Sequence, residues 1–149
     1  GTGGAMLLAS TCLTEPFLVL NGDTYIELDL NNFYDFHIKK KSQLTLSLFK
    51  TSNLERYMGV NIDSDKRIVS LIHINNSSNY CMANGGVYLV EPSLLSLLKY
   101  NLGIKLSLED ELLPNIIENG GRVFGSETNG KFIDIGLPED YLKSTKIIN

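Results

Sequence analysis

The feature that most constrains the fold of this chain is a short apolar run that leads into a carboxylate. Phe17–Leu20 (Phe-Leu-Val-Leu) follows Pro16 and continues directly into Asn21-Gly22-Asp23. A continuous apolar run of this length, closed by turn-forming residues, is typical of a strand buried on both faces of a sheet. We therefore expect a sheet covered on both faces, with Asp23 at the carboxyl end of one of its strands.

The rest of the chain alternates between strand and helix patterns. Strands are predicted at residues 45–49, 59–62, 67–71, 86–90, 122–125 and 132–133. Helices are predicted at residues 5–13, 30–40 and 107–119, and from residues 92 and 137 onward. Ser107 and Asp110 have the spacing of a capping box at a helix start. This alternation is typical of an α/β fold, and we expect one domain over residues 1–149.

Charge and cysteine content argue against several classes of protein. The formal net charge is −4, whereas a nucleic-acid-binding surface needs a basic stripe, so no nucleic-acid partner is expected. No apolar run reaches the roughly 18 residues of a membrane span, so no membrane partner is expected. Cys12 and Cys81 are too few for a disulfide framework, and we expect buried free thiols in a reducing cytoplasm. His37 and His73 have no obvious partner in the sequence and are expected at the surface.

Two aspartates occupy similar positions after apolar strands. Asp23 follows Phe17–Leu20, and Asp134 follows Phe132-Ile133 and precedes Gly136. In open α/β sheets, ligands bind at the carboxyl ends of strands. Two carboxylates there can hold one Mg²⁺ whose other ligands are water and phosphate oxygens. Taken singly, each aspartate is equally consistent with a turn or a helix cap.

The first residues, Gly1-Thr2-Gly3-Gly4, precede a predicted helix. Backbone N–H groups in such a segment can approach a nucleotide closely, although the glycines are also consistent with a simple turn. The chain has no initiator Met, and this start is typical of an internal loop. We therefore expect the gene product to continue upstream.

Five motifs, in this order, resemble those of the sugar-phosphate nucleotidyltransferase family. They are Gly1–Ala5, Phe17–Thr24, Asn84–Leu89, Ser107–Glu109 with Leu112–Pro114, and Phe132–Tyr141. The resemblance covers essentially the whole chain, and the order of five motifs is more specific than any one of them. It implies the nucleotide-diphospho-sugar transferase (Rossmann-like) fold, a mixed sheet with flanking helices. Residues 1–149 would then be the C-terminal two-thirds of a single nucleotidyltransferase domain that lacks its N-terminal phosphate-loop part.

The resemblance also implies roles for individual residues. The implied metal-binding and catalytic pair is Asp23 and Asp134; the nucleotide-binding residues are Gly1, Thr2, Gly3 and Asp23; the sugar-binding residues are Asn84, Gly86 and Glu109. Gly86 is also consistent with strand packing alone, and Glu109 with a helix start. The implied cofactor is Mg²⁺.

Within the family, the motifs are most similar to enzymes that transfer a guanylyl group. The implied substrates are a nucleoside triphosphate, with GTP favoured, and a heptose- or mannose-type sugar 1-phosphate. The products would be pyrophosphate and a nucleotide sugar for cell-surface polysaccharide synthesis. We expect the 149-residue chain alone to be inactive, and a homo-oligomer is compatible with its apolar strand.

Two departures from the family pattern favour an alternative, a non-catalytic sugar-nucleotide-binding or regulatory relative. Met58 stands where relatives carry a small residue facing the sugar, and residues 71–74 replace a Glu-Glu-Lys segment. Both departures predict a more apolar sugar pocket.

Overall fold

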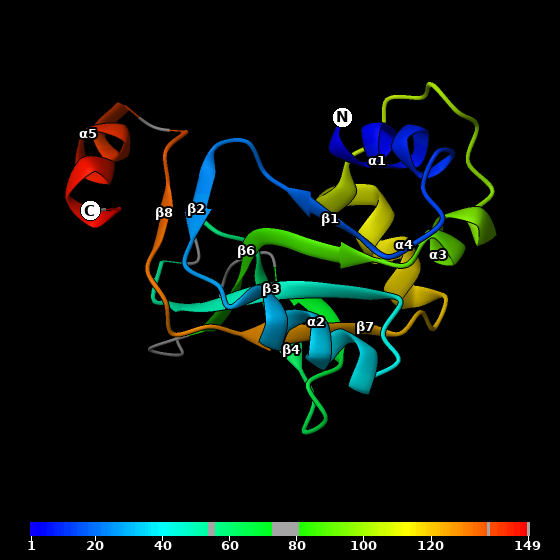
Figure 1. Cartoon of the computed structure of the whole chain (residues 1–149), viewed down its shortest axis with the longest axis horizontal. Helices are drawn as coiled ribbons and strands as arrows, with labels where there is room; N and C mark the ends of the chain where they lie inside the picture. The colour runs from blue at the N-terminus through cyan, green and yellow to red at the C-terminus, as the bar shows by residue number, and fades with distance from the viewer. Residues whose placement is uncertain (54–55, 73–80, 137, 149) are drawn as a thin grey trace.

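The computed structural model describes residues 1–53, 56–72, 81–136 and 138–148, which form a mixed α/β fold (Figure 1). The main sheet has the strand order β5-β4-β6-β3-β7, and β1 also pairs with β6. Its strands are β1 (Phe17–Leu20), β3 (Leu44–Thr51), β4 (Gly59–Ile62), β5 (Ile68–Ile72), β6 (Cys81–Val90) and β7 (Val123–Glu127). β3 and β7 run parallel, and the other pairs described are antiparallel. The predicted fold class is confirmed.

A second, two-stranded sheet includes Asp134 and begins directly after Asp23. β2 (Thr24–Ile26) pairs antiparallel with β8 (Phe132–Asp134), and Thr24 lies opposite Asp134. The Ile135 N–H donates to the Asp23 carbonyl at 2.7 Å and extends this pairing. The two segments that carry Asp23 and Asp134 therefore lie side by side.

The helices pack on both faces of the main sheet. They are α1 (Thr2–Ser10), α2 (Leu30–Lys39), α3 (Pro92–Leu97), α4 (Leu113–Glu118) and α5 (Pro138–Ile147), with a π-helical turn, η1 (Leu108–Leu112), directly before α4. Figure 1 shows α1, α3 and α4 gathered at one end of the molecule and α5 apart from them, beside β8.

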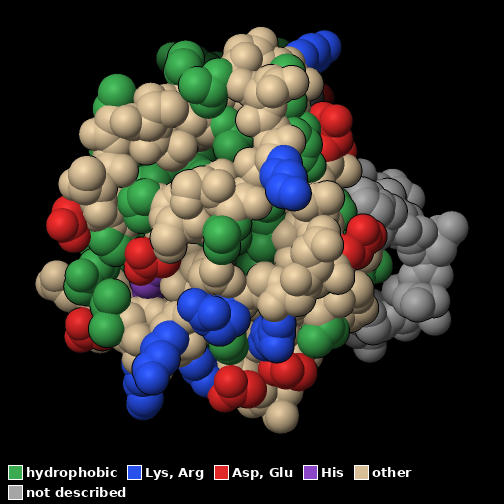
Figure 2. Space-filling view, turned by 90° about the vertical axis from the view of Figure 1, so that its right-hand side faces the viewer, with side chains coloured by type: hydrophobic (Ala, Val, Ile, Leu, Met, Phe, Trp, Pro, Cys, Tyr) green, Lys and Arg blue, Asp and Glu red, His purple; other side chains and the backbone are tan. Residues whose placement is uncertain are grey.

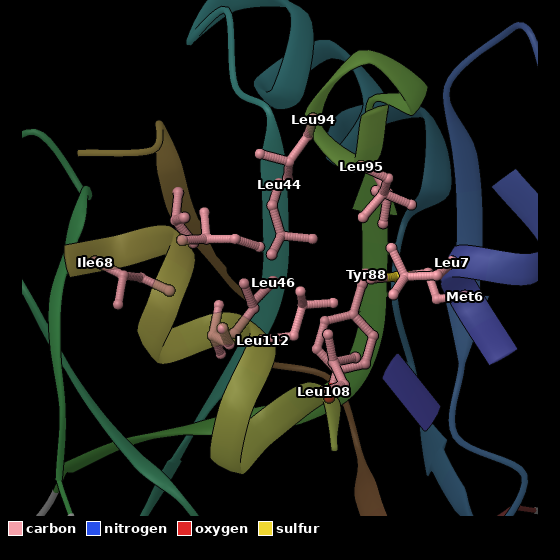
Figure 3. Close-up of a cluster of buried hydrophobic side chains, with 14 of the residues drawn as sticks. Met6, Leu7, Leu44, Leu46, Ile68, Tyr88, Leu94, Leu95, Leu108 and Leu112 are labelled. Atoms are coloured by element: carbon pink, nitrogen blue, oxygen red, sulfur yellow. The ribbon is translucent and has the colours of Figure 1, made fainter. Parts of the chain in front are cut away.

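The core is built by alternate side chains of the central strands, as the twofold period of a strand requires. One face buries Leu44, Leu46, Leu48, Tyr88 and Val90 against α1, α3, η1 and α4 (Figure 3). On the other face, Val87 and Leu89 pack against Phe33 of α2.

α2 is held to the sheet by a buried histidine. Its start is capped by Asp29, whose Oδ1 accepts the Asn31 and Asn32 N–H groups at 3.0 and 3.1 Å. His37 is only 1% exposed, and its ring nitrogens lie 2.8 Å from Thr45 Oγ1 and 3.2 Å from Glu91 Oε1. The expectation of a surface histidine was wrong for His37. His73 lies outside the described residues.

β1 has the predicted bounds but not the predicted burial. Phe17 and Val19 pack against the core, whereas Leu18 and Leu20 are 40% and 63% exposed. Within the described part of the chain β1 pairs with β6 alone, so it lies at an edge of the sheet. The expectation of a strand buried on both faces was therefore wrong.

The N-terminal helix begins earlier than predicted, at Thr2. A Cβ on Gly4 would lie 2.4 Å from the Ile104 carbonyl oxygen, so the glycine allows the helix to approach that segment closely. Cys12, just beyond α1, is exposed and Cys81 is half-buried, so the expected burial of both thiols was wrong. Among the described residues, no helix combines the length and apolar character needed to cross a bilayer.

Figure 2 shows the end of the molecule that lies to the right in Figure 1. Apolar side chains are visible at several points of this face, and most of its basic side chains gather toward the lower edge, with acidic side chains beside them. The basic side chains on this face do not form a continuous stripe.

Candidate active site

A cleft opens where β6 changes its neighbour. One edge of β6 pairs with β4 at Met82 and Ala83, and with β1 from Val87 onward. Asn84 and Gly86, which lie between these pairings, face a cleft of about 210 Å³. It is lined by Asn21, Asp23, Thr24, Arg56, Tyr57, Met58, Asn84, Gly86, Glu109, Phe132 and Asp134. This cleft, which opens where β6 pairs with neither β4 nor β1, brings together five of the predicted site residues. They are Asp23, Asn84, Gly86, Glu109 and Asp134.

The carboxylates of Asp23 and Asp134 face a common point. A Cβ built on Gly136 would lie 3.1 Å from Asp134 Oδ1 and 3.4 Å from Asp23 Oδ2. The predicted convergence of these two aspartates in one cleft is therefore observed, although 111 positions separate them in the sequence.

An arginine that the sequence analysis did not assign to the site contacts Asp134. Arg56 Nη2 lies 3.2 Å from Asp134 Oδ2 and donates to the main-chain carbonyl of the same residue at 3.0 Å. Its Nη1 forms an ion pair with Asp140 of α5. Lys143 and Arg56 together hold the pKa of Asp140 below its usual range. The Arg-Tyr-Met-Gly segment in the sequence was the available signal for Arg56.

A hydrogen-bonded network forms the polar wall of the cleft. Asn84 Nδ2 donates to Tyr88 Oη at 2.6 Å and to Glu109 Oε1 at 2.8 Å. The Tyr88 hydroxyl donates to Glu109 Oε1 at 2.9 Å. Burial raises the pKa of Tyr88, and the adjacent Glu109 carboxylate raises it further, so the phenol stays neutral and remains a donor. This network fixes the side chains of Asn84 and Glu109, the two polar residues predicted for the sugar.

The turn that carries Glu109 is capped as predicted, with one difference. Ser107 Oγ accepts the Asp110 N–H at 3.1 Å, but the Ser107 N–H donates to Glu111 Oε2 at 2.7 Å and not to Asp110. The reciprocal partner falls one residue later because this first turn is a π turn, which is wider than an α turn.

The backbone conformation at position 86 requires a glycine. Its φ is +76°, and a Cβ there would lie 2.7 Å from Thr24 Oγ1 and 3.0 Å from Asn21 Nδ2. The Asn21 N–H donates to the Gly86 carbonyl at 2.8 Å. Gly86 thus allows β1 and β2 to approach the wall of the cleft, whether or not it also contacts a ligand.

The glycine-rich start lies outside this set of cleft-lining residues. A Cβ on Gly1 or Gly3 would meet the Leu106 carbonyl oxygen at 2.4 or 3.1 Å, and Thr2 Oγ1 accepts the Leu108 N–H at 3.3 Å. These contacts pack α1 against the segment that leads into η1 and Glu109. The predicted nucleotide-binding role of Gly1, Thr2 and Gly3 remains a prediction.

The two departures from the family pattern, at Met58 and at residues 71–74, lie at different places in the structure. Met58 lines the cleft, and its carbonyl accepts the Asn84 N–H at 3.0 Å. Leu71 packs against the main core instead. It is not among the cleft-lining residues described, so the predicted apolar character of the sugar pocket is carried by Met58 in the described part of the chain. Residues 73 and 74 lie outside the described residues.

The donor set fits Mg²⁺. The described residues contain no group of three or more His, Cys, Asp or Glu side chains arranged around one point, so Asp23 and Asp134 would act as a pair. Mg²⁺ prefers oxygen ligands and commonly binds through one or two carboxylates plus phosphate oxygens and water. Arg56 lies at Asp134 Oδ2, whereas Asp134 Oδ1 and Asp23 Oδ2 both lie within 3.4 Å of the Cβ position of Gly136.

The whole chain, residues 1–149, matches the family model described as nucleotidyl transferase, and the chain therefore belongs to that family.

Among its relatives, the chain is 34% identical over 147 residues to D-glycero-alpha-D-manno-heptose 1-phosphate guanylyltransferase of Aneurinibacillus thermoaerophilus, covering 98% of this chain and 62% of that protein. It is 25% identical over 147 residues to mannose-1-phosphate guanylyltransferase of Mycobacterium tuberculosis, covering 97% of this chain and 40% of that protein.

A solved structure of HddC from Yersinia pseudotuberculosis is also similar, with a TM-score of 0.83 and 31% identity. The match covers all of this chain and 63% of that one. A further HddC structure, complexed with GMP-PN, has a TM-score of 0.82. The chain thus spans about three-fifths of the length of HddC and of the heptose enzyme.

Proposed function

We propose that the full-length protein joins a nucleoside triphosphate, GTP in the first place, to a heptose- or mannose-type sugar 1-phosphate and releases pyrophosphate. The reaction would take place in the cytoplasm and supply a nucleotide sugar for cell-surface polysaccharides. The observation that carries the proposal is the convergence of Asp23 and Asp134 beside the polar wall of Asn84 and Glu109. The family, and the guanylyltransferase names of several relatives, support it.

The chemistry needs alignment and charge neutralisation more than proton transfer. The second pKa of a phosphate monoester is near 6, so a sugar 1-phosphate is mostly a dianion at neutral pH. Its oxygen forms the new bond to the α-phosphorus of the triphosphate, and the bond from that phosphorus to the pyrophosphate oxygen breaks. No proton has to leave the attacking oxygen, so the residues of the cleft would act by holding two anions in line.

Each group of cleft residues would have a separate task. Asn84 and Glu109, fixed by their mutual hydrogen bond, would position sugar hydroxyls. Asp23 and Asp134 would hold Mg²⁺, which when bound supplies positive charge to the phosphate oxygens.

A panel assay tests the proposal. The full-length protein, with Mg²⁺, is incubated with each common nucleoside triphosphate and with heptose, mannose or glucose 1-phosphate, and pyrophosphate is measured. We expect release with GTP and a heptose or mannose 1-phosphate, and background release when the sugar phosphate or Mg²⁺ is omitted. Background release from every pair would contradict the proposal.

One observation favours a second candidate, a non-catalytic sugar-nucleotide-binding relative. Met58, an apolar residue, lines the cleft. For this candidate, calorimetry on the same protein would detect nucleotide-sugar binding while every pair in the panel gave background pyrophosphate.

A further inference from the structure

Arg56 contacts two oxygens of Asp134, the main-chain carbonyl oxygen and the carboxylate oxygen Oδ2. A single guanidinium nitrogen, Nη2, donates to the main-chain carbonyl of Asp134 at 3.0 Å and lies 3.2 Å from its Oδ2. The Gly136 N–H donates to the other carboxylate oxygen, Oδ1, at 2.9 Å. These contacts restrain the rotation of the carboxylate, and Oδ1 lies beside the Cβ position of Gly136, which Asp23 Oδ2 also approaches, at 3.1 and 3.4 Å respectively.

Arg56 is itself held from outside the cleft. Its Nη1 pairs with Asp140, which stands in the first turn of α5 and is 8% exposed. Its guanidinium also lies 5.2 Å from the ring centroid of Tyr57. The guanidinium is therefore fixed between β8 and α5 and does not depend on a ligand for its position.

The charges of this arrangement favour a cation at the aspartate pair. A lone arginine beside Asp134 would compete with a divalent cation. Asp140, which also pairs with Lys143 at 3.0 Å, offsets part of the charge of Arg56, so Asp23 and Asp134 keep part of their combined negative charge for the cation. Arg56 also reduces the repulsion between the two carboxylates while no cation is bound.

We propose that Arg56, anchored by Asp140, is a positioning residue for the divalent cation: it presents Oδ1 of Asp134 toward Asp23. This inference rests on the metal site of the proposed function. Groups that orient metal ligands in this way typically change metal affinity 10- to 100-fold when they are removed.

The test measures Mn²⁺ binding to the full-length protein directly, from the electron paramagnetic resonance signal of free Mn²⁺, with and without GTP. For Arg56→Met and for Asp140→Asn we expect the Mn²⁺ dissociation constant to rise about 10- to 100-fold. Affinity for metal-free GTP should stay within about twofold of the parent protein, because these substitutions act on the cation site. Arg56→Lys should recover only part of the loss, since an ammonium does not reproduce the two-sided guanidinium contact.

Lys66→Met is the matched control, because it removes the surface ion pair with Glu127, which lies outside the cleft-lining set. Its Mn²⁺ affinity should equal that of the parent protein. If Arg56→Met fails to fold, Asp140→Asn and Arg56→Lys decide the question, since both keep the size of the native side chain.

The outcomes separate this inference from the function on which it rests. Parent-like Mn²⁺ affinity in Asp140→Asn and the folded Arg56 variants, with loss of binding in Asp134→Asn, would overturn the role of Arg56 and leave the metal site intact. Parent-like Mn²⁺ affinity in both Asp23→Asn and Asp134→Asn would show that these two aspartates do not bind the cation, which would contradict the metal site itself.

Discussion

At the scale of residues, the cleft depends on a few positions whose backbone or charge admits little change. Gly86 has a positive φ and stands against Thr24 and Asn21, whereas Gly22, two residues before Thr24, has open space around its Cβ position. The fold therefore requires glycine at position 86, whereas the space around Gly22 would also admit a side chain.

Replacing Gly86 by alanine should destabilise the protein. The left-handed conformation and the contact at 2.7 Å with Thr24 Oγ1 together predict a loss of about 1–3 kcal/mol in the free energy of unfolding. Gly22→Ala is the control, and we expect a change within about 1 kcal/mol in either direction. Urea unfolding of both variants checks this, and equal destabilisation by the two substitutions would contradict it.

The sequence predicted the candidate aspartates because each follows an apolar strand and precedes a turn, a pattern confined to a few neighbouring residues. Arg56 was missed because its partner Asp134 lies 78 positions away and the pairing exists only after the sheet has formed. The orientation of Asn84 and Glu109 was likewise beyond a local pattern, since 25 positions separate them.

At the scale of elements, the type and approximate place of most helices and strands followed from local periodicity, although α1 and β6 begin earlier than predicted and β2 was not predicted. Burial depended on which elements lie next to one another. The run Phe17–Leu20 formed a strand as predicted, yet its edge position exposes Leu18 and Leu20. In α2 the helical pattern was clear, but the burial of His37 required Thr45 of β3 and Glu91 beyond β6.

The attachment of α2 should depend on pH through His37. Burial lowers the pKa of His37 in the folded protein, although the Glu91 carboxylate opposes part of this effect. In the unfolded chain a histidine titrates near pH 6.5, so below that pH the unfolded state binds more protons and the folded state loses stability. The loss should end once the pH passes below the lowered folded pKa.

His37→Gln removes this titration and provides the comparison. Urea midpoints measured between pH 8 and pH 5 should fall more steeply for the parent protein than for the variant. Parallel curves for the two proteins would show that His37 does not contribute to the pH dependence.

At the scale of the whole molecule, the exposed edge of β1 is the feature with consequences for assembly. An apolar edge strand with unpaired backbone groups invites association with another chain. Leu18 and Leu20 present this apolar surface to solvent.

We therefore expect the 149-residue polypeptide to self-associate in solution, as measured by sedimentation. Replacing both Leu18 and Leu20 by lysine should weaken the association at least about tenfold, because charge at an edge strand opposes pairing. Leu97→Lys, at an exposed apolar position on α3, is the control and should leave the association unchanged. A parent polypeptide that sediments as a monomer would contradict the prediction.

The central claim is that Asp23 and Asp134 act as one unit in nucleotidyl transfer. Its most direct test is the kcat/KM of the full-length protein with GTP and its preferred sugar 1-phosphate, compared for Asp23→Asn, Asp134→Asn and the double variant. Each single variant should lose at least about 100-fold with its unfolding midpoint retained, and the double variant should lose about as much as either one, because residues that act as a unit are not additive. Losses that multiply in the double variant, or single variants as active as the parent, would contradict the shared site.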